Sequence, residues 1–221
     1  MSALRTNVVV TGPLVALDVK TLAVAVDELA ARDADLASIV ERYGPPPLGD
    51  RAPGFATLVH IILEQQVSLA SAQAAFDGLR SAADPLTPKR FLALSDAELL
   101  GIGFSRQKAR YGRALATALV YGSLDLDGLA KLDDEAAQRE LVAIPGIGPW
   151  TATIYLLMAL GRPDLWPVGD IALAQAVAEV KSLDGRPSSL EMAALSEAWR
   201  PWRSVAARIF WHDYLTRRGR S

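Results

Sequence analysis

The sequence predicts an all-α protein. Alanine, the strongest helix former, accounts for 37 of the 221 residues. Apolar residues recur every three or four positions along most of the chain, which is the spacing of one face of an α-helix. The β-branched alternation typical of strands is nearly absent, and residues 7–10 are the only weak candidate. We therefore expect helices joined by short loops in an all-α fold, which the proline and glycine breaks described below divide into two lobes with a cleft between them.

Helical regions follow from this periodicity and from helix-start residues. The first region has an expected break near Arg32 and Asp33. In the fourth, Ser95 and Glu98 have the spacing of a capping box, in which each side chain accepts from a backbone N–H of the first turn. Ser105 is expected to cap the fifth. The expected regions are 22–43, 55–80, 88–94, 95–101, 105–120, 133–143, 150–160, 171–180, 189–198 and 201–216.

Composition excludes several functional classes. The chain has no cysteine, which excludes a disulfide framework, a thiolate metal site, an iron–sulfur cluster and a Cys nucleophile. The hydrophobic content of 51 % and the charged content of 22 % argue against disorder.

No apolar stretch reaches the roughly 18 residues that a spanning helix needs, and the N-terminus lacks a full signal peptide. We expect an intracellular, cytoplasmic protein without membrane contact.

Proline and glycine mark the divisions within the chain. The strongest breaks are residues 44–47 and 161–163. We expect an N-terminal segment, 1–20, that is poorly ordered, followed by one helical fold over 21–221. Within that fold a middle lobe covers about 60–160, and a second lobe combines about 21–55 with 165–216.

The most informative stretch is residues 141–152, which read LVAIPGIGPWTA. An apolar helix is expected to end there and a second helix to begin near Pro149, because proline suits a first helical turn. Glycines allow a tight turn, and the amides at a helix N-terminus form an anion site that suits a DNA phosphate. An ordinary helix–helix turn is the alternative. The expected DNA-binding residues here are Pro145, Gly146, Ile147, Gly148 and Thr151.

This stretch resembles the helix-hairpin-helix of the DNA base-excision glycosylases, and most closely the alkylation-repair branch, 3-methyladenine DNA glycosylase II. The resemblance covers roughly residues 20–215 and implies the two-lobed helical fold of that superfamily. Four ordered segments at family-like spacing carry it: 62–68 (ILEQQVS), 103–109 (GFSRQKA), the hairpin through 166–170 (WPVGD), and 199–204 (WRPWRS).

Asp170 matches the catalytic aspartate of that family. From local sequence alone, an Asp before the apolar run 171–177 is a helix N-cap, and the two interpretations are compatible. The resemblance implies hydrolysis of the N-glycosidic bond, with the carboxylate stabilising positive charge on the sugar. The alkylation branch often has a second acid just before this Asp, whereas this chain has Gly169.

Position 150 separates two mechanisms in the family. Bifunctional relatives carry a lysine there, which forms a Schiff base and also cuts the strand. This chain has Trp150. The resemblance therefore implies a monofunctional enzyme that leaves an abasic site after excision of 3-methyladenine or 7-methylguanine.

Aromatic residues are expected to line the pocket for the flipped base, because a base inside a duplex is out of reach. The alternative is that Trp150, together with Trp199 and Trp211, lies in the hydrophobic core. The expected pocket residues are Trp150, Trp202, Tyr155 and Trp166.

Further DNA contacts are expected outside the hairpin. The resemblance places Gln66 as the side chain that fills the gap left by the flipped base, with Gln65 in support. Arg203 and Ser204 are expected either to contact phosphate or to brace the Asp170 loop.

His60 and His212 are expected to be structural. No metal-ligand cluster is evident, although the hairpin carbonyls are of a type that can hold a monovalent cation.

The net charge of −2 hides an uneven distribution. Residues 104–113 carry four cationic side chains and no acid, and residues 200–221 carry six arginines against Asp213.

We expect a monomer that binds damaged double-stranded DNA and is associated with the nucleoid. Two other classes stay open: a glycosylase for deaminated or oxidised purines, and a non-catalytic protein that binds lesions or DNA. An all-α interaction domain without a DNA role is a further alternative.

Overall fold

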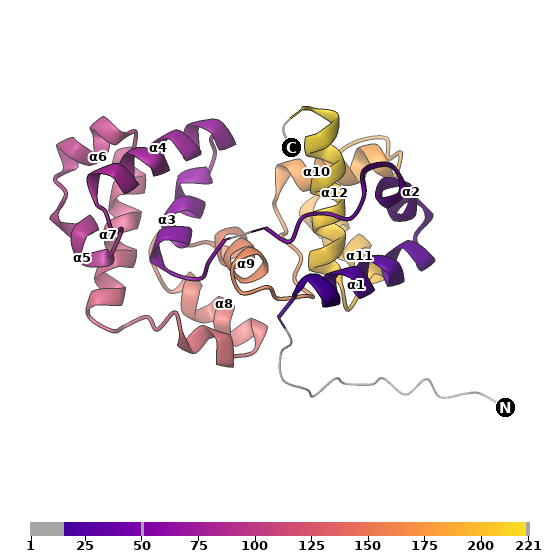
Figure 1. The fold of residues 1–221 in the computed structure, drawn as a ribbon, viewed down its shortest axis with the longest axis horizontal. Coiled ribbons are helices and arrows are strands. Elements are labelled where there is room, and N and C mark those ends of the chain that lie inside the picture. The colour runs from indigo at the N-terminus through magenta and orange to yellow at the C-terminus, as the bar shows by residue number, and fades with distance from the viewer. Residues whose placement is uncertain (1–15, 50, 220–221) are drawn as a thin grey trace.

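The computed structural model describes residues 16–49 and 51–219, and all regular secondary structure within them is helical (Figure 1). This confirms the all-α prediction. No helix in this part of the chain is long and apolar enough to cross a membrane. The α-helices are α1 (Val19–Arg32), α2 (Ala34–Tyr43), α3 (Phe55–Glu64), α4 (Leu69–Ala82), α5 (Pro88–Ala93), α6 (Asp96–Ile102), α7 (Arg106–Val120), α8 (Asp134–Val142), α9 (Pro149–Met158), α10 (Ile171–Val180), α11 (Ser189–Ser196) and α12 (Arg203–Arg217), and the 3-10 turns are η1 (Gly128–Lys131) and η2 (Glu197–Trp199).

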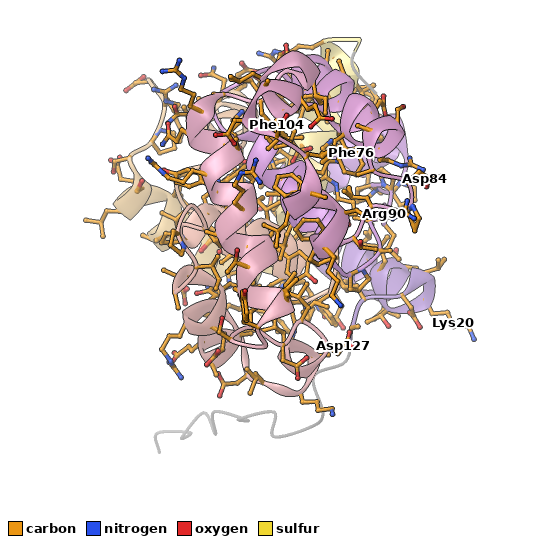
Figure 2. All side chains as sticks on the ribbon, turned by 90° about the vertical axis from the view of Figure 1, so that its left-hand side faces the viewer. Lys20, Phe76, Asp84, Arg90, Phe104 and Asp127 are labelled. Atoms are coloured by element: carbon orange, nitrogen blue, oxygen red, sulfur yellow. The ribbon has the colours of Figure 1, made fainter. Side chains whose placement is uncertain are left out.

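Two hydrophobic clusters form the core. Helices α3 to α9 supply the first, and α1, α2, α10, α11 and α12 supply most of the second. Figure 1 shows these groups as two lobes with α9 between them. Leu157 of α9 belongs to the second cluster, whereas most of that helix packs in the first. Figure 2 views the molecule from the first lobe, where Phe76 and Phe104 lie among the side chains packed between helices.

Arg208 of α12 connects this helix to two other segments of the chain. Its side chain is 5 % exposed, and it donates to the carbonyls of Leu48 at 2.6 Å and Leu157 at 3.0 Å. Burial lowers the pKa of Arg208 to about 10, which leaves the guanidinium charged at neutral pH. One cation therefore ties α12 both to the connection before α3 and to the end of α9.

The expected break in the first helical region is confirmed at Asp33. Its carboxylate accepts from the N–H groups of Asp35 and Leu36 and so begins α2. The same carboxylate accepts from Lys181 at 2.7 Å and from the Trp199 indole at 2.8 Å. Burial opposes ionisation of Asp33, but these two partners outweigh it and lower the pKa.

The expectation of one helical region over 55–80 is wrong. The chain leaves the helix after Glu64, and α4 begins only at Leu69. Gln66 adopts a positive φ of 58°, which a helix does not allow, and the Ser68 hydroxyl accepts from Ser71 N to cap α4. The interruption creates the loop 65–68 between the two helices.

The expectations for the N-terminus fall mostly outside the described residues, which begin at 16. The candidate strand at 7–10 lies there, as does most of the segment 1–20. Where that segment is described, Leu17 is 7 % exposed and its N–H donates to the Gly161 carbonyl at 2.7 Å. Helix α1 then begins at Val19, earlier than expected, because Asp18 accepts from Thr21 N.

Candidate active site

The hairpin joins α8 to α9 and packs against Tyr111 of α7. Leu141, Ile144 and Ile147 are buried in the first cluster, which fixes both helix ends. Gly146 has φ of +92°, and a Cβ there would lie 2.1 Å from Cγ of Tyr111. Only glycine fits this position, because the backbone conformation is unfavourable for other residues and Tyr111 fills the adjacent space.

The hairpin amides are only partly available to a ligand. The Ile147 N–H donates to the Ile144 carbonyl at 3.0 Å, so the expectation that Ile147 contacts DNA is wrong for both its buried side chain and its amide. Within the described residues, no hydrogen bond is made by the N–H of Gly146 or of Gly148. Of the turn residues, Pro145 is exposed, and Gly146 and Gly148, whose amides make none of these bonds, are half-buried.

Gln65 connects α3 to the hairpin. Its amide nitrogen donates to the Gly146 carbonyl and to the Thr151 hydroxyl, both at 2.9 Å. Thr151 is 2 % exposed, so a direct DNA contact by its side chain is excluded and its role is to hold Gln65. The Gly146 carbonyl thus already accepts one hydrogen bond, and a monovalent cation at the hairpin carbonyls, which the sequence allows, is not tested.

Gln66 stands exposed at the tip of the loop between α3 and α4. Its positive φ of 58° is uncommon for a residue other than glycine, and such conformations often occur at functional sites. Two apolar side chains flank it, Val67 at 46 % and Leu69 at 56 % exposure. Exposed apolar side chains such as these are of the type that proteins insert between base steps, and here they flank the polar Gln66.

Asp170 lies half-buried at the start of α10, and three N–H groups approach its carboxylate. Its Oδ1 accepts from Leu173 N at 2.7 Å, which confirms the N-cap interpretation. Its Oδ2 accepts from the Trp150 indole at 3.0 Å, and Oδ1 is 3.5 Å from the Trp211 indole nitrogen. The helix that begins at the hairpin therefore reaches the candidate catalytic carboxylate directly.

Trp211 was expected in the core, and the structure places it at the site. It is partly buried and packs against both clusters while its indole nitrogen faces Asp170. No local pattern marks this role, because only the packing of α12 against α10 brings the two residues together.

Three of the expected pocket residues have other partners. Tyr155 is wholly buried in the first cluster, where its hydroxyl accepts from Gly54 N at 3.0 Å and burial raises its pKa. Trp166 is 6 % exposed and packs against Trp199 with ring centroids 5.1 Å apart. Trp202 donates to the carboxylate of Glu28 at 2.6 Å. Burial rules out Tyr155 as a pocket wall and makes Trp166 a core residue, so of the four only Trp150 is seen at Asp170.

Arg203 and Ser204 brace the segment that leads to Asp170. Arg203 donates to the Asp164 carboxylate at 2.9 Å and to the Asp164 carbonyl at 2.5 Å. Ser204 is wholly buried, accepting from Leu165 N at 2.9 Å and donating to Leu165 O at 3.1 Å. A phosphate contact by Ser204 is therefore excluded, and the bracing alternative describes both residues.

The histidines make packing contacts. His60 stacks on Phe76 with centroids 4.2 Å apart, and burial lowers the pKa of its imidazole. His212 Nε2 lies 3.2 Å from the Tyr43 carbonyl. Over residues 16–49 and 51–219 no group of three or more His, Asp or Glu side chains is placed to hold a metal ion.

Comparison with known proteins identifies the family. Residues 59–201 match the family described as HhH-GPD superfamily base excision DNA repair protein. The putative DNA-3-methyladenine glycosylase YfjP of Bacillus subtilis is 35 % identical over 126 residues, which are 57 % of this chain and 44 % of that protein. The chain spans less than half the length of the first curated relatives it matches.

Two solved structures extend the comparison to the fold. A DNA-3-methyladenine glycosidase from Bacillus halodurans is 28 % identical with a TM-score of 0.71, covering 88 % of this chain and 91 % of the other. The Schizosaccharomyces pombe 3-methyladenine DNA glycosylase in complex with abasic DNA has a TM-score of 0.79 at 24 % identity, covering 88 % and 96 %. The chain belongs to the HhH-GPD superfamily of base excision DNA repair proteins.

Proposed function

We propose that this chain is a monofunctional DNA glycosylase that removes alkylated purines, such as 3-methyladenine and 7-methylguanine, from double-stranded DNA. The observation that carries the proposal is the Asp170 carboxylate, held by the Trp150 indole at 3.0 Å and by the first turn of α10. The names of the relatives and structural neighbours support the substrate class.

The chemistry required of Asp170 is modest. When the bond between the base nitrogen and C1′ breaks, the electron pair leaves with the base and positive charge develops on the sugar. A carboxylate beside C1′ stabilises that charge and orients the water whose oxygen then bonds to C1′, and it accepts the proton that this water loses. An alkylated purine that already carries a positive charge leaves as a neutral base, so a separate general acid is not required.

The remaining parts of the site account for base flipping. The free amides of Gly146 and Gly148 bind a backbone phosphate without reading sequence. Gln66, exposed on its loop, occupies the gap in the stack. The indoles of Trp150 and Trp211, which converge on Asp170, offer aromatic surface to the extruded cationic base.

The residue at position 150 supports monofunctionality. A strand-cutting relative needs an amine beside C1′ to form a Schiff base, whereas the side chain that contacts Asp170 here is the indole of Trp150. We expect the chain to act as a monomer and to leave an intact abasic strand. Cleavage without added base or heat, or a borohydride-trapped covalent complex, would contradict this.

The test is release of 3-methyladenine and 7-methylguanine from methylated duplex DNA under single-turnover conditions. Asp170→Asn keeps the helix cap and removes the charge, so excision should fall by about 100-fold or more. Asp133→Asn is the matched control, because Asp133 caps α8 in the same way, accepting from Ala136 N at 2.7 Å. Equal excision by Asp170→Asn and Asp133→Asn would overturn the assignment.

A further inference from the structure

The two arginine-rich segments of the chain differ in what their charges contact. In the C-terminal segment the described arginines are already engaged, and Arg220 lies outside the described residues. Arg208 is buried against carbonyl groups. The others form ion pairs: Arg200 and Arg203 with Asp164 at 2.7 and 2.9 Å, and Arg217 and Arg218 with Glu179 at 2.8 and 2.9 Å.

The cations at the start of α7 are arranged differently. Of the four between 106 and 113, only Arg113 pairs with a carboxylate in the described part of the chain, that of Asp96 at 2.7 Å. Arg106 and Arg110 are exposed, and Arg110 lies over the Tyr111 ring at 5.7 Å. Exposed arginines without acidic partners keep their full charge available to an anionic ligand.

Two contacts fix this end of α7 beside the candidate DNA-binding elements. The Lys108 ammonium donates to the Leu63 carbonyl at 2.6 Å, close to the loop that carries Gln66. One turn further, Tyr111 packs beneath Gly146 of the hairpin. The exposed arginines therefore border both the hairpin and the Gln66 loop.

We propose that Arg106 and Arg110 bind the phosphate backbone of duplex DNA next to the hairpin, and that the arginines of the C-terminal segment do not. The inference rests on the proposed function, since it assigns the electrostatic part of the same binding surface. Charge complementarity with a polyphosphate backbone is the argument for the occupant, because the neighbouring hairpin amides also favour an anion. The chain thereby has a local basic surface despite its net charge of −2.

The experiment measures binding to a short duplex that carries a central abasic-site analogue, over a series of salt concentrations. The slope of log K against log salt is negative, and each lost phosphate contact makes it less steep by about 0.9. Arg106→Gln with Arg110→Gln should therefore make it less steep by about 1.8. The matched control, Arg186→Gln with Arg218→Gln, removes the same charge from exposed sites, and Arg217 still pairs with Glu179. Its slope should equal that of the unmodified chain.

Excision at saturating enzyme separates this proposal from the proposed function. The Arg106 and Arg110 variant should still release base when enough enzyme is present to bind all of the DNA, because the described hydrogen bonds of the Asp170 carboxylate come from Trp150, Leu173 and Trp211 and from neither arginine. An unchanged slope in that variant, or an equal fall in the control, would overturn the inference. Binding without excision by the unmodified chain would overturn only the proposed function, and absence of binding would overturn both.

Discussion

Replacement of Gly146 by alanine tests whether the hairpin depends on the packing seen at its tip. The new Cβ would lie 2.1 Å from Cγ and 2.5 Å from Cβ of Tyr111, where carbon atoms normally keep about 3.5–4.0 Å apart. The φ of +92° adds backbone strain of about 1–2 kcal/mol for a residue with a side chain. Tyr111 can move only partly, because it is half-buried between α7 and the hairpin.

The magnitude follows from these two costs. Overpacking of a well-filled site costs about 1–3 kcal/mol. Together with the backbone term, Gly146→Ala should reduce the free energy of unfolding by about 2–5 kcal/mol. For a chain of this size the thermal midpoint should fall by roughly 4–20 °C, which circular dichroism measures directly.

Gly148→Ala supplies the comparison within the same turn. Gly148 has φ of −88°, and no atom lies within 4 Å of a Cβ built there. Alanine at such a position reduces the freedom of the unfolded chain and stabilises by about 0.4–1 kcal/mol. Equal midpoints for the two variants, or a normal midpoint for Gly146→Ala, would refute the steric argument.

Three further predictions concern the site and its surroundings. Trp150→Phe keeps an aromatic ring but removes the donor 3.0 Å from Asp170, so single-turnover excision should slow about tenfold. Gln65→Ala removes two hydrogen bonds and should lower the free energy of unfolding by about 1–3 kcal/mol in urea titrations. Hydrogen bonds, first from Arg218, lower the pKa of Glu179 from 4.5 to about 2. This stabilisation is present above pH 4.5 and lost as the pH falls towards 2, so Glu179→Gln should show a smaller loss of stability over that range.

Each of these has a matched control. Trp202→Phe removes an indole donor that serves Glu28, and normal excision is expected. Gln73→Ala removes an exposed amide whose hydrogen bond goes to the nearby Asp77 at 2.9 Å, so the unfolding free energy should hardly change. Glu135→Gln alters a carboxylate that is 90 % exposed, and its acid sensitivity should match the unmodified chain. A control that changes as much as its partner variant would contradict the corresponding prediction.

Local signals in the sequence predicted local structure well. The capping box of Ser95 and Glu98 is present, with both reciprocal hydrogen bonds, and Ser105 caps α7 as expected. Asp33 ends one helix and begins the next. These interactions join groups no more than four residues apart, so their residue types and spacing are sufficient to predict them.

The candidate site depends on contacts that local patterns do not encode. Trp211 reaches Asp170 across 41 positions, and Gln65 reaches the hairpin across 81. Tyr155 lies on a helix that is buried almost all round, so sequence periodicity does not tell which of its side chains faces the site. The local sequence indicates the hairpin and the resemblance points to Asp170, whereas tertiary packing decides which aromatic residues accompany them.

The charge that a segment presents at the surface is likewise not predictable from the sequence alone. The sequence gives the sign of the segment that carries Arg203 and Arg217, but not its partners. In the structure Asp164 and Glu179, each about 40 positions away, neutralise these arginines. The electrostatic character of a surface therefore depends on the fold as much as on composition.

The two hydrogen bonds of Gln65 have a consequence for the geometry of DNA scanning. Because they fasten the Gln66 loop to the hairpin, the protein fixes the distance between the hairpin amides and the Gln66 side chain. In a chain that binds DNA as proposed, each base that the protein examines would then lie the same number of nucleotides from the bound phosphate. The two hydrogen bonds would thus determine which base along the duplex is examined, before any base is recognised.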